Sequence, residues 1–256
     1  MWRKIRILIL LLILLFVALN TYFDRLYTTD WDIPLRVTVF PINADGSAVS
    51  ERFVQNLSPA DLLALENFFQ TESQEYGIHM DRPVRFALAA PMRELPPMIE
   101  PGAGRLSIAL WSLRTRYWAW RAPVHLAGPK PDIELFALFH DPKLSSRLPH
   151  SIGLQKGLFG IVHAFADRTM MGSNDVVIAH EFLHTLGATD KYDLSTDQPI
   201  LPIGYAEPKR QPLYPQEFAE VMGGKIPVSP DRAEMPESLQ QVIVGPATAV
   251  EIGWKK

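Results

Sequence analysis

The sequence predicts an α+β fold in which a mixed, twisted sheet is combined with an active-site helix and is preceded by one N-terminal transmembrane helix. Three observations lead to this prediction. Short segments that alternate between apolar and polar residues, as strands do, are separated by segments with helical spacing. An unbroken apolar run lies close to the N-terminus. A helical segment near residue 180 carries two histidines four residues apart, on one face of the helix.

The composition is that of a folded protein without thiol chemistry. The chain has 256 residues, of which 47% are hydrophobic and 21% are charged, enough for a packed core in one domain or two small ones. The net charge of −3 shows no basic excess, so we expect no nucleic-acid partner. The chain has no cysteine, which excludes disulfides and thiolate metal sites and leaves His, Asp and Glu as the strong metal ligands.

The N-terminal segment predicts a signal anchor. Residues 7–19 are all apolar, and residues 5–23 just reach the length of about 17–25 residues that a membrane-spanning helix needs. Three basic residues among the first six favour a cytoplasmic N-terminus. We therefore expect a cytoplasmic tip at residues 1–4, a single-pass anchor in the cell membrane, and a periplasmic or extracellular domain. A cleaved signal peptide, which would make the protein secreted, is the alternative.

Residues 24–32 read as a linker, and residues 33–256 as the domain itself. A helix is expected from Ser58, its N-cap, and Pro59 at its first position to about Gly77. The segments that alternate like strands are 35–40, 84–89, 133–139 and 158–166.

Residues 105–121 combine four arginines with aromatic side chains. An amphipathic helix or strand is the favoured interpretation. A surface that binds single-stranded nucleic acid and one that contacts a membrane are alternatives.

Near the C-terminus, residues 238–244 and 246–254 read as two short helices.

The run from His180 to Asp190 has the pattern H-E-x-x-H-x-x-G-x-x-D. His180 and His184 are one helical turn apart, so both imidazoles can approach one metal ion, and neutral imidazole suits Zn²⁺. Glu181 is positioned to hold a water molecule and act as general base. Gly187 permits the left-handed turn that ends a helix, and Asp190 follows it as the candidate third ligand. The site therefore predicts one catalytic zinc ion.

Other residues compete for these roles. Asp193 is the rival third ligand, although the spacing after Gly187 favours Asp190. His163 precedes the site on a predicted strand and is more often a structural residue than a ligand. The remaining histidines lack ligand spacing and are His79, His125, His140 and His150.

The run resembles the extended motif of the metzincin clan of zinc metallopeptidases. Asp190 in place of a third histidine is similar to the snapalysin-like and immune-inhibitor-A-like variants. Clan members have a turn methionine beneath the zinc, and Met222 is the candidate in this sequence. Some members also carry a tyrosine two residues after it, where this chain has Gly224. The candidates for that role are Tyr192, Tyr205 and Tyr214, and spacing favours none of them.

The resemblance implies a zincin-like fold with an upper subdomain to about residue 187 and a lower one from 188 to 256. It implies a membrane-anchored zinc endopeptidase, a hydrolase of peptide bonds in which Glu181 is the general base. The substrate would be a peptide or protein lying along residues 158–166 if that strand is an exposed edge. The alternatives are a catalytically silent binding module at the membrane and a zinc hydrolase of non-peptide bonds.

Overall fold

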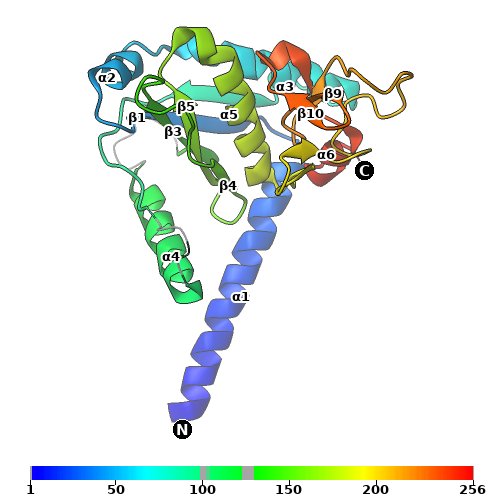
Figure 1. The fold of residues 1–256 in the computed structure, drawn as a ribbon. Coiled ribbons are helices and arrows are strands. Elements are labelled where there is room, and N and C mark those ends of the chain that lie inside the picture. The colour runs from blue at the N-terminus through cyan, green and yellow to red at the C-terminus, as the bar shows by residue number, and fades with distance from the viewer. Residues whose placement is uncertain (1, 99–101, 103, 123–129, 256) are drawn as a thin grey trace.

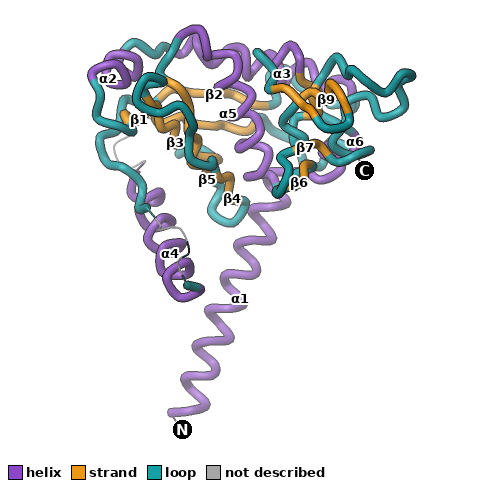
Figure 2. The backbone as a smooth tube through the Cα atoms, in the orientation of Figure 1, coloured by secondary structure: helices purple, strands orange, loops and turns teal. Residues whose placement is uncertain are grey.

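A five-stranded sheet forms the centre of the protein (Figures 1 and 2). The computed structural model describes residues 2–98, 102, 104–122 and 130–255. The strand order is β2-β1-β3-β5-β4, and every neighbouring pair is parallel except β5 with β4. The strands of this sheet are β1 (Leu35–Asn43), β2 (Val84–Leu88), β3 (Ile133–His140), β4 (Ile152–Leu154) and β5 (Phe159–Phe165).

Helices cover both faces of the sheet. The helices are α1 (Trp2–Thr29), α2 (Ala48–Gln55), α3 (Leu63–Glu75), α4 (Arg105–Arg121), α5 (Met171–Leu186) and α6 (Pro246–Glu251). After α5 the chain forms three small two-stranded pairs. These pairs are β6 (Tyr192–Asp193) with β7 (Gln198–Pro199), β8 (Ala219–Glu220) with β11 (Val242–Ile243), and β9 (Ile226–Ser229) with β10 (Arg232–Glu234).

Strand β3 shows why the core has two parts. Its residues are buried along almost the whole strand, as expected for a central strand covered on both faces. Leu135 and Ala137 point to the larger core, which contains side chains of α3 and α5. Phe136 and Leu138 alternate to the other face, where Phe136 packs against Trp118 of α4 with a ring distance of 4.4 Å.

The predicted α+β class is wrong, because the fold is a mixed α/β arrangement with a sheet rich in parallel pairs. Parallel strands need a long crossover connection, and helices α2 and α3 supply it between β1 and its parallel neighbour β2. The four predicted strands are all present as β1, β2, β3 and β5. Strand β4 lies within a segment that reads as a polar loop, so periodicity could not indicate it.

Strand β5 is not the sheet edge that the sequence suggested. It lies between β3 and β4, and β4 pairs with it antiparallel and forms the edge. An extended peptide that adds to this side of the sheet would therefore contact β4.

The predicted transmembrane anchor is also corrected. Within the part of the chain that the structure describes, no helix combines the length and the apolar character needed to cross a membrane. The prediction of a single-pass membrane protein with an external domain is accordingly not supported.

Helix α1 nevertheless forms, and it projects from the body (Figure 1). It continues to Thr29 through most of the predicted linker 24–32. Trp31, directly after the helix, donates its indole N–H to the Ile252 carbonyl at 2.8 Å and packs edge-on against Trp254 with a ring distance of 5.6 Å. The base of α1 is therefore fixed to the C-terminal segment.

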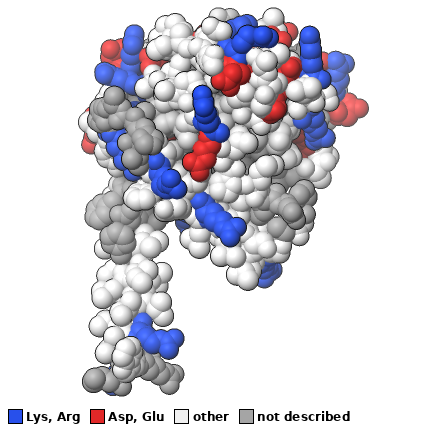
Figure 3. Space-filling model, turned by 90° about the vertical axis from the view of Figure 1, so that its left-hand side faces the viewer, with Lys and Arg blue, Asp and Glu red and all other residues white. Residues whose placement is uncertain are grey.

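Segment 105–121 is a helix, α4, and one of its faces contacts the sheet through Trp118 and Ala119. Charged side chains of both signs are interspersed over the face of the body shown in Figure 3.

The segment predicted as a helix at 238–244 is instead a 3-10 turn (Leu239–Gln241) followed by β11.

Candidate metal centre

Helix α5 supplies the first two candidate ligands and is tied to the sheet beneath it. Its apolar face, which includes Ile178, Phe182 and Leu186, is buried in the larger core. The helix begins at Met171 after a 3-10 turn, so Asn174 lies inside it and is not its N-cap. Asn174 instead exchanges two hydrogen bonds with the backbone of Phe165 on β5, at 2.9 and 3.0 Å, and so fixes the helix against the strand.

Gly187 ends the helix as predicted. Its φ of 103° lies in the left-handed region, which glycine adopts at little energetic cost because it has no Cβ. Its N–H and that of Ala188 donate to the carbonyls of the last turn, His184 and Leu183. The chain then turns back towards the face of α5 that carries the histidines.

His180, His184 and Asp190 converge as the spacing predicted, and they form a group able to hold a metal ion. The two Nε2 atoms are 3.0 Å apart, and each lies 3.1 Å from Oδ1 of Asp190. The histidine side chains are largely buried, whereas the Asp190 side chain is one third exposed. The group therefore opens to solvent on the Asp190 side.

The partners of the two Nδ1 atoms fix the chemistry of this group. His180 Nδ1 lies 2.9 Å from the Val221 carbonyl, and His184 Nδ1 lies 2.8 Å from the Ala188 carbonyl. A carbonyl only accepts, so Nδ1 carries the proton in both rings and both neutral rings present a bare Nε2. Two bare nitrogens and a carboxylate oxygen within about 3 Å repel one another unless a cation lies among them. This donor set fits a metal ion.

The carboxylate of Asp190 is held in its ionised form. Burial alone would raise its pKa, but His180 and His184, where they carry a proton on Nε2, lower it far below its usual value by hydrogen bonds and charge, and a bound cation would act in the same direction. Tyr192 lies beside the group, with its ring 6.2 Å from that of His180. Burial and the nearby carboxylates raise the pKa of Tyr192 to about 12, so its phenol stays protonated and can donate.

The loop that carries Asp190 is anchored on the C-terminal helix α6. Thr189 donates its N–H and its hydroxyl to the two carboxylate oxygens of Glu251, at 3.0 and 2.7 Å. Lys191 is almost fully buried and places its ammonium 2.7 Å from the same carboxylate. Both neighbours of the third ligand are thus held by one side chain, Glu251.

Glu181 lies beside the ligands on the same helix. Its side chain is buried, and Oε2 has no hydrogen-bond partner among the residues that the structure describes. Burial raises the pKa of Glu181, while the two histidines and the N–H of Gly153 on β4 oppose this rise. A carboxylate whose pKa is raised in this way is a candidate to accept a proton and release it again.

The segment around Met222 forms a turn next to His180. Its N–H groups at Gly223 and Gly224 donate to the Glu220 carbonyl, and the carbonyl of Met222 accepts the N–H of Lys191 at 2.9 Å. The Met222 side chain is fully buried in the larger core. The hydrogen bond from this turn to a candidate ligand is accepted by the Val221 carbonyl.

The rival ligands lie elsewhere. The Asp193 carboxylate accepts hydrogen bonds from Ser195 and Thr196 in a local turn. His163 pairs with His140, with 2.9 Å between ring nitrogens, on the sheet face that α4 covers. Tyr205 and Tyr214 bond to each other at 2.8 Å. His79 and His150 are not in the metal-ligand group, and His125 lies outside the described residues.

Sequence reasoning missed residues that pack against the site from distant parts of the chain. An added Cβ at Gly153 would lie 2.5 Å from the His184 Cβ and 2.3 Å from the Glu181 carbonyl, so β4 passes directly against the ligand helix. Glu220 and Glu251 were missed as well. Nothing in the spacing of these three residues indicates the contacts, which arise only from folding.

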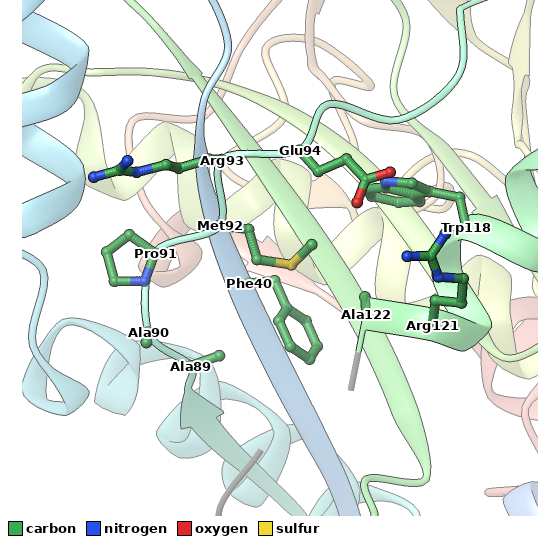
Figure 4. Close-up of a pocket in the computed structure, with 10 residues that line it drawn as sticks. All are labelled: Phe40, Ala89, Ala90, Pro91, Met92, Arg93, Glu94, Trp118, Arg121 and Ala122. Carbon is green, nitrogen blue, oxygen red and sulfur yellow. The ribbon is translucent and has the colours of Figure 1, made fainter. Parts of the chain in front are cut away.

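Two cavities bear on function. One of about 150 Å³ adjoins the ligands and is lined on one side by Val176, Val177 and His180 and on the other by Tyr192 and Met235. A larger one of about 320 Å³ lies by α4, where Trp118 and Arg121 face Met92 and Phe40 (Figure 4). Only the first lies beside the metal-ligand group.

Comparison with known proteins gives no match to a protein-family model, a curated protein or a solved structure.

Proposed function

We propose that the protein is a zinc-dependent hydrolase that cleaves peptide bonds, with His180, His184 and Asp190 as the zinc ligands. The observation that carries the proposal is the convergence of two bare imidazole nitrogens and a carboxylate oxygen beside a buried glutamate. Two imidazoles and one carboxylate, with room for a further ligand, form a typical donor set of catalytic zinc sites.

The polypeptide supplies the proton transfers. A zinc ion held here would supply Lewis acidity, which makes a water molecule acidic near neutral pH and polarises a carbonyl group. The Glu181 carboxylate then accepts the proton of the attacking water and passes it to the leaving amine. Its unpartnered Oε2 and its raised pKa suit both steps.

Tyr192 has a supporting role in this proposal. Its ring lies 6.2 Å from that of His180, and its hydroxyl stays neutral and can donate to a group bound at the site. It is the one tyrosine of the three candidates that reaches the ligand group, so it takes the place of the tyrosine that the sequence lacks at position 224.

The arrangement favours an extended substrate. Strand β4 is a sheet edge next to His184 and Glu181, and a peptide can add to such an edge through backbone hydrogen bonds. The 150 Å³ cavity beside His180 would receive one substrate side chain. Its walls at Val176 and Val177 are apolar, while Lys225 and Asp197 form an ion pair at its border, so a small or medium apolar side chain fits best.

Glu181→Gln tests the proposal. This variant should bind zinc as the wild type does and lose about 10²–10⁴-fold in the rate of cleavage of an unfolded protein such as denatured casein, because the amide cannot accept a proton. Glu217→Gln is the matched control, since Glu217 is an exposed glutamate paired with Arg210, and it should retain full activity.

Three results would contradict the proposal in different ways. Full activity in Glu181→Gln would exclude Glu181 as the base. A wild-type protein that binds zinc but cleaves neither peptides nor esters would be a silent binding module. Cleavage of a small ester without cleavage of any peptide would indicate a hydrolase of non-peptide bonds.

A further inference from the structure

A buried glutamate outside the ligand group bonds to the turn that holds His180. Glu220 ends β8, and its side chain is completely buried. Its Oε2 accepts the N–H groups of Met222 and Gly223, both at 2.8 Å. Its Oε1 accepts the Gly245 N–H at 3.1 Å and the Thr248 hydroxyl at 2.6 Å. Four donors thus meet one carboxylate.

The Met222 N–H and the Val221 carbonyl belong to the same planar peptide unit. Glu220 holds the N–H end of this unit, and the carbonyl end accepts Nδ1–H of His180 at 2.9 Å. A negative charge at the N–H end also polarises the peptide and makes its carbonyl oxygen a stronger acceptor. The carboxylate, the peptide and the imidazole therefore form one hydrogen-bonded chain.

We infer that Glu220 is a positioning residue for the metal centre, which acts on His180 through the Val221–Met222 peptide and increases metal affinity without touching the metal. The inference rests on the proposed zinc site. A group that accepts the N–H of a ligand histidine on the side away from the metal holds the ring in place. Removing such a group commonly lowers metal affinity by about 10–100-fold. Glu220 does not itself bond to His180; it holds the Val221–Met222 peptide that does. We therefore expect a change in zinc affinity at the lower end of this range.

The four contacts explain why a carboxylate is needed. An ionised carboxylate has only acceptors, and all four groups donate to it; three of them are backbone N–H groups, which cannot accept. An amide at this position would turn its NH₂ group towards N–H or O–H donors and leave part of the set unpaired. Glutamine is therefore a specific test of the acceptor role, at nearly constant shape.

The experiment compares Glu220→Gln with Thr248→Val in the full chain, using zinc alone as the probe. Thr248→Val removes a buried donor to Oε1 and leaves the Oε2 contact with the Met222 peptide in place. The zinc dissociation constant, measured by competition with a chromophoric chelator, should rise about tenfold in Glu220→Gln and stay unchanged in Thr248→Val. The Nδ1–H proton resonance of His180 should move upfield in Glu220→Gln alone, since its hydrogen bond weakens.

A purely structural role gives a different result. Both variants would then lower the melting temperature, while zinc affinity and the His180 resonance stayed at wild-type values, and this outcome would overturn the inference. If Glu220→Gln does not fold, Glu220→Asp replaces it, because the shorter carboxylate also loosens the contact; unchanged zinc affinity there would overturn the inference too. A wild-type protein that binds no zinc would instead overturn the proposed function itself.

Discussion

Two backbone carbonyls decide which nitrogen each histidine presents to the site. The Val221 and Ala188 carbonyls take up the Nδ1 protons, so both rings turn Nε2 inward. Ala188 follows the glycine that ends the helix, and Val221 comes from a turn 41 residues after His180. The ligand geometry thus depends equally on a local turn and on a distant one.

Gly153 is the residue at which the sheet edge and the ligand helix come closest. In a Gly153→Ala variant the new methyl group would overlap the Glu181 carbonyl and the His184 Cβ, so α5 must shift. We expect a loss of about 1–3 kcal/mol in the free energy of unfolding and a weaker zinc affinity. Urea unfolding and chelator competition measure the two effects.

Gly104→Ala is the control for this prediction, because an added Cβ there meets no atom within 4 Å. It should leave zinc affinity at its wild-type value, and any loss of stability should reflect only the poorer N-cap that alanine gives α4. A Gly153→Ala protein as stable as the wild type would show that β4 and α5 are not in tight contact.

At the scale of residues, the sequence indicated the candidate metal ligands but not the residues that hold them in place. His180, Glu181 and His184 share one helix and Asp190 follows one turn later, so spacing alone brings them together. Glu220, Glu251 and Gly153 reach the group through tertiary contacts, and no local pattern carries that information.

The C-terminal helix α6 connects both loops of the metal centre. Thr248 on this helix bonds to Glu220 beneath the turn at Met222, and Glu251 at its end bonds to both neighbours of Asp190. A helix of six residues has little stability of its own, so it depends on these contacts and on its buried residues. The ligand loops and α6 stabilise one another.

The pair of Lys191 and Glu251 gives a prediction for this element. Glu251→Gln leaves the nearly buried ammonium of Lys191 without its counter-charge, which should cost about 2 kcal/mol of folding free energy, allowing for the partial exposure of Glu251. The double variant Lys191→Met with Glu251→Gln removes the stranded charge and should recover most of that loss. Thermal unfolding of the two single variants and the double variant measures the coupling.

One outcome would contradict the expected coupling between Lys191 and Glu251. If the losses of the two single variants simply add in the double variant, the two side chains do not interact, and α6 does not hold the Asp190 loop through this pair.

At the scale of elements, prediction depended on length and periodicity. Strands β1, β3 and β5 have seven to nine residues and were found from their patterns. Strand β4 has three residues in a polar segment and was missed, although it forms the edge beside the site. The apolar N-terminal run was correctly expected to be helical, but among the described residues no helix is both long and apolar enough for the predicted membrane span.

The whole molecule buries several carboxylates that prefer to be protonated. Burial raises the pKa of Glu72, of Glu134 and of Asp175 to about 7 in each case. Oδ1 of Asp175 has no hydrogen-bond partner among the described residues, and the residue lies at the N-terminal end of α5, away from the ligands. Ionising such a group in the folded protein is unfavourable.

This burial predicts a pH-dependent stability. Between pH of about 4, where Asp175 ionises in the unfolded chain, and pH 7, the folded protein keeps a proton that the unfolded chain has lost. The contribution of Asp175 to stability is therefore present at low pH and is lost as the pH rises towards 7. The free energy of unfolding of Asp175→Asn, relative to that of the wild type, should therefore rise by on the order of 2 kcal/mol from pH 5 to pH 8.

Urea unfolding of both proteins at pH 5, 6, 7 and 8 measures this difference. A difference between variant and wild type that does not change with pH would show that Asp175 ionises normally in the folded state.

Fold class was the least predictable property of the whole molecule. Strand and helix order was read correctly along most of the chain, yet the parallel pairing of β1, β2, β3 and β5 depends on contacts between residues far apart in sequence. The ligand pattern needed no knowledge of that topology, because it lies within one helix and the turn after it.

Metal analysis of the purified full chain tests the central claim most directly. After incubation with zinc and removal of the excess, the wild type should hold one zinc ion per chain, and His184→Ala should hold almost none, since it removes one of the two bare imidazole nitrogens. A wild-type protein without bound zinc, or a His184→Ala variant with the same zinc content as the wild type, would contradict the account.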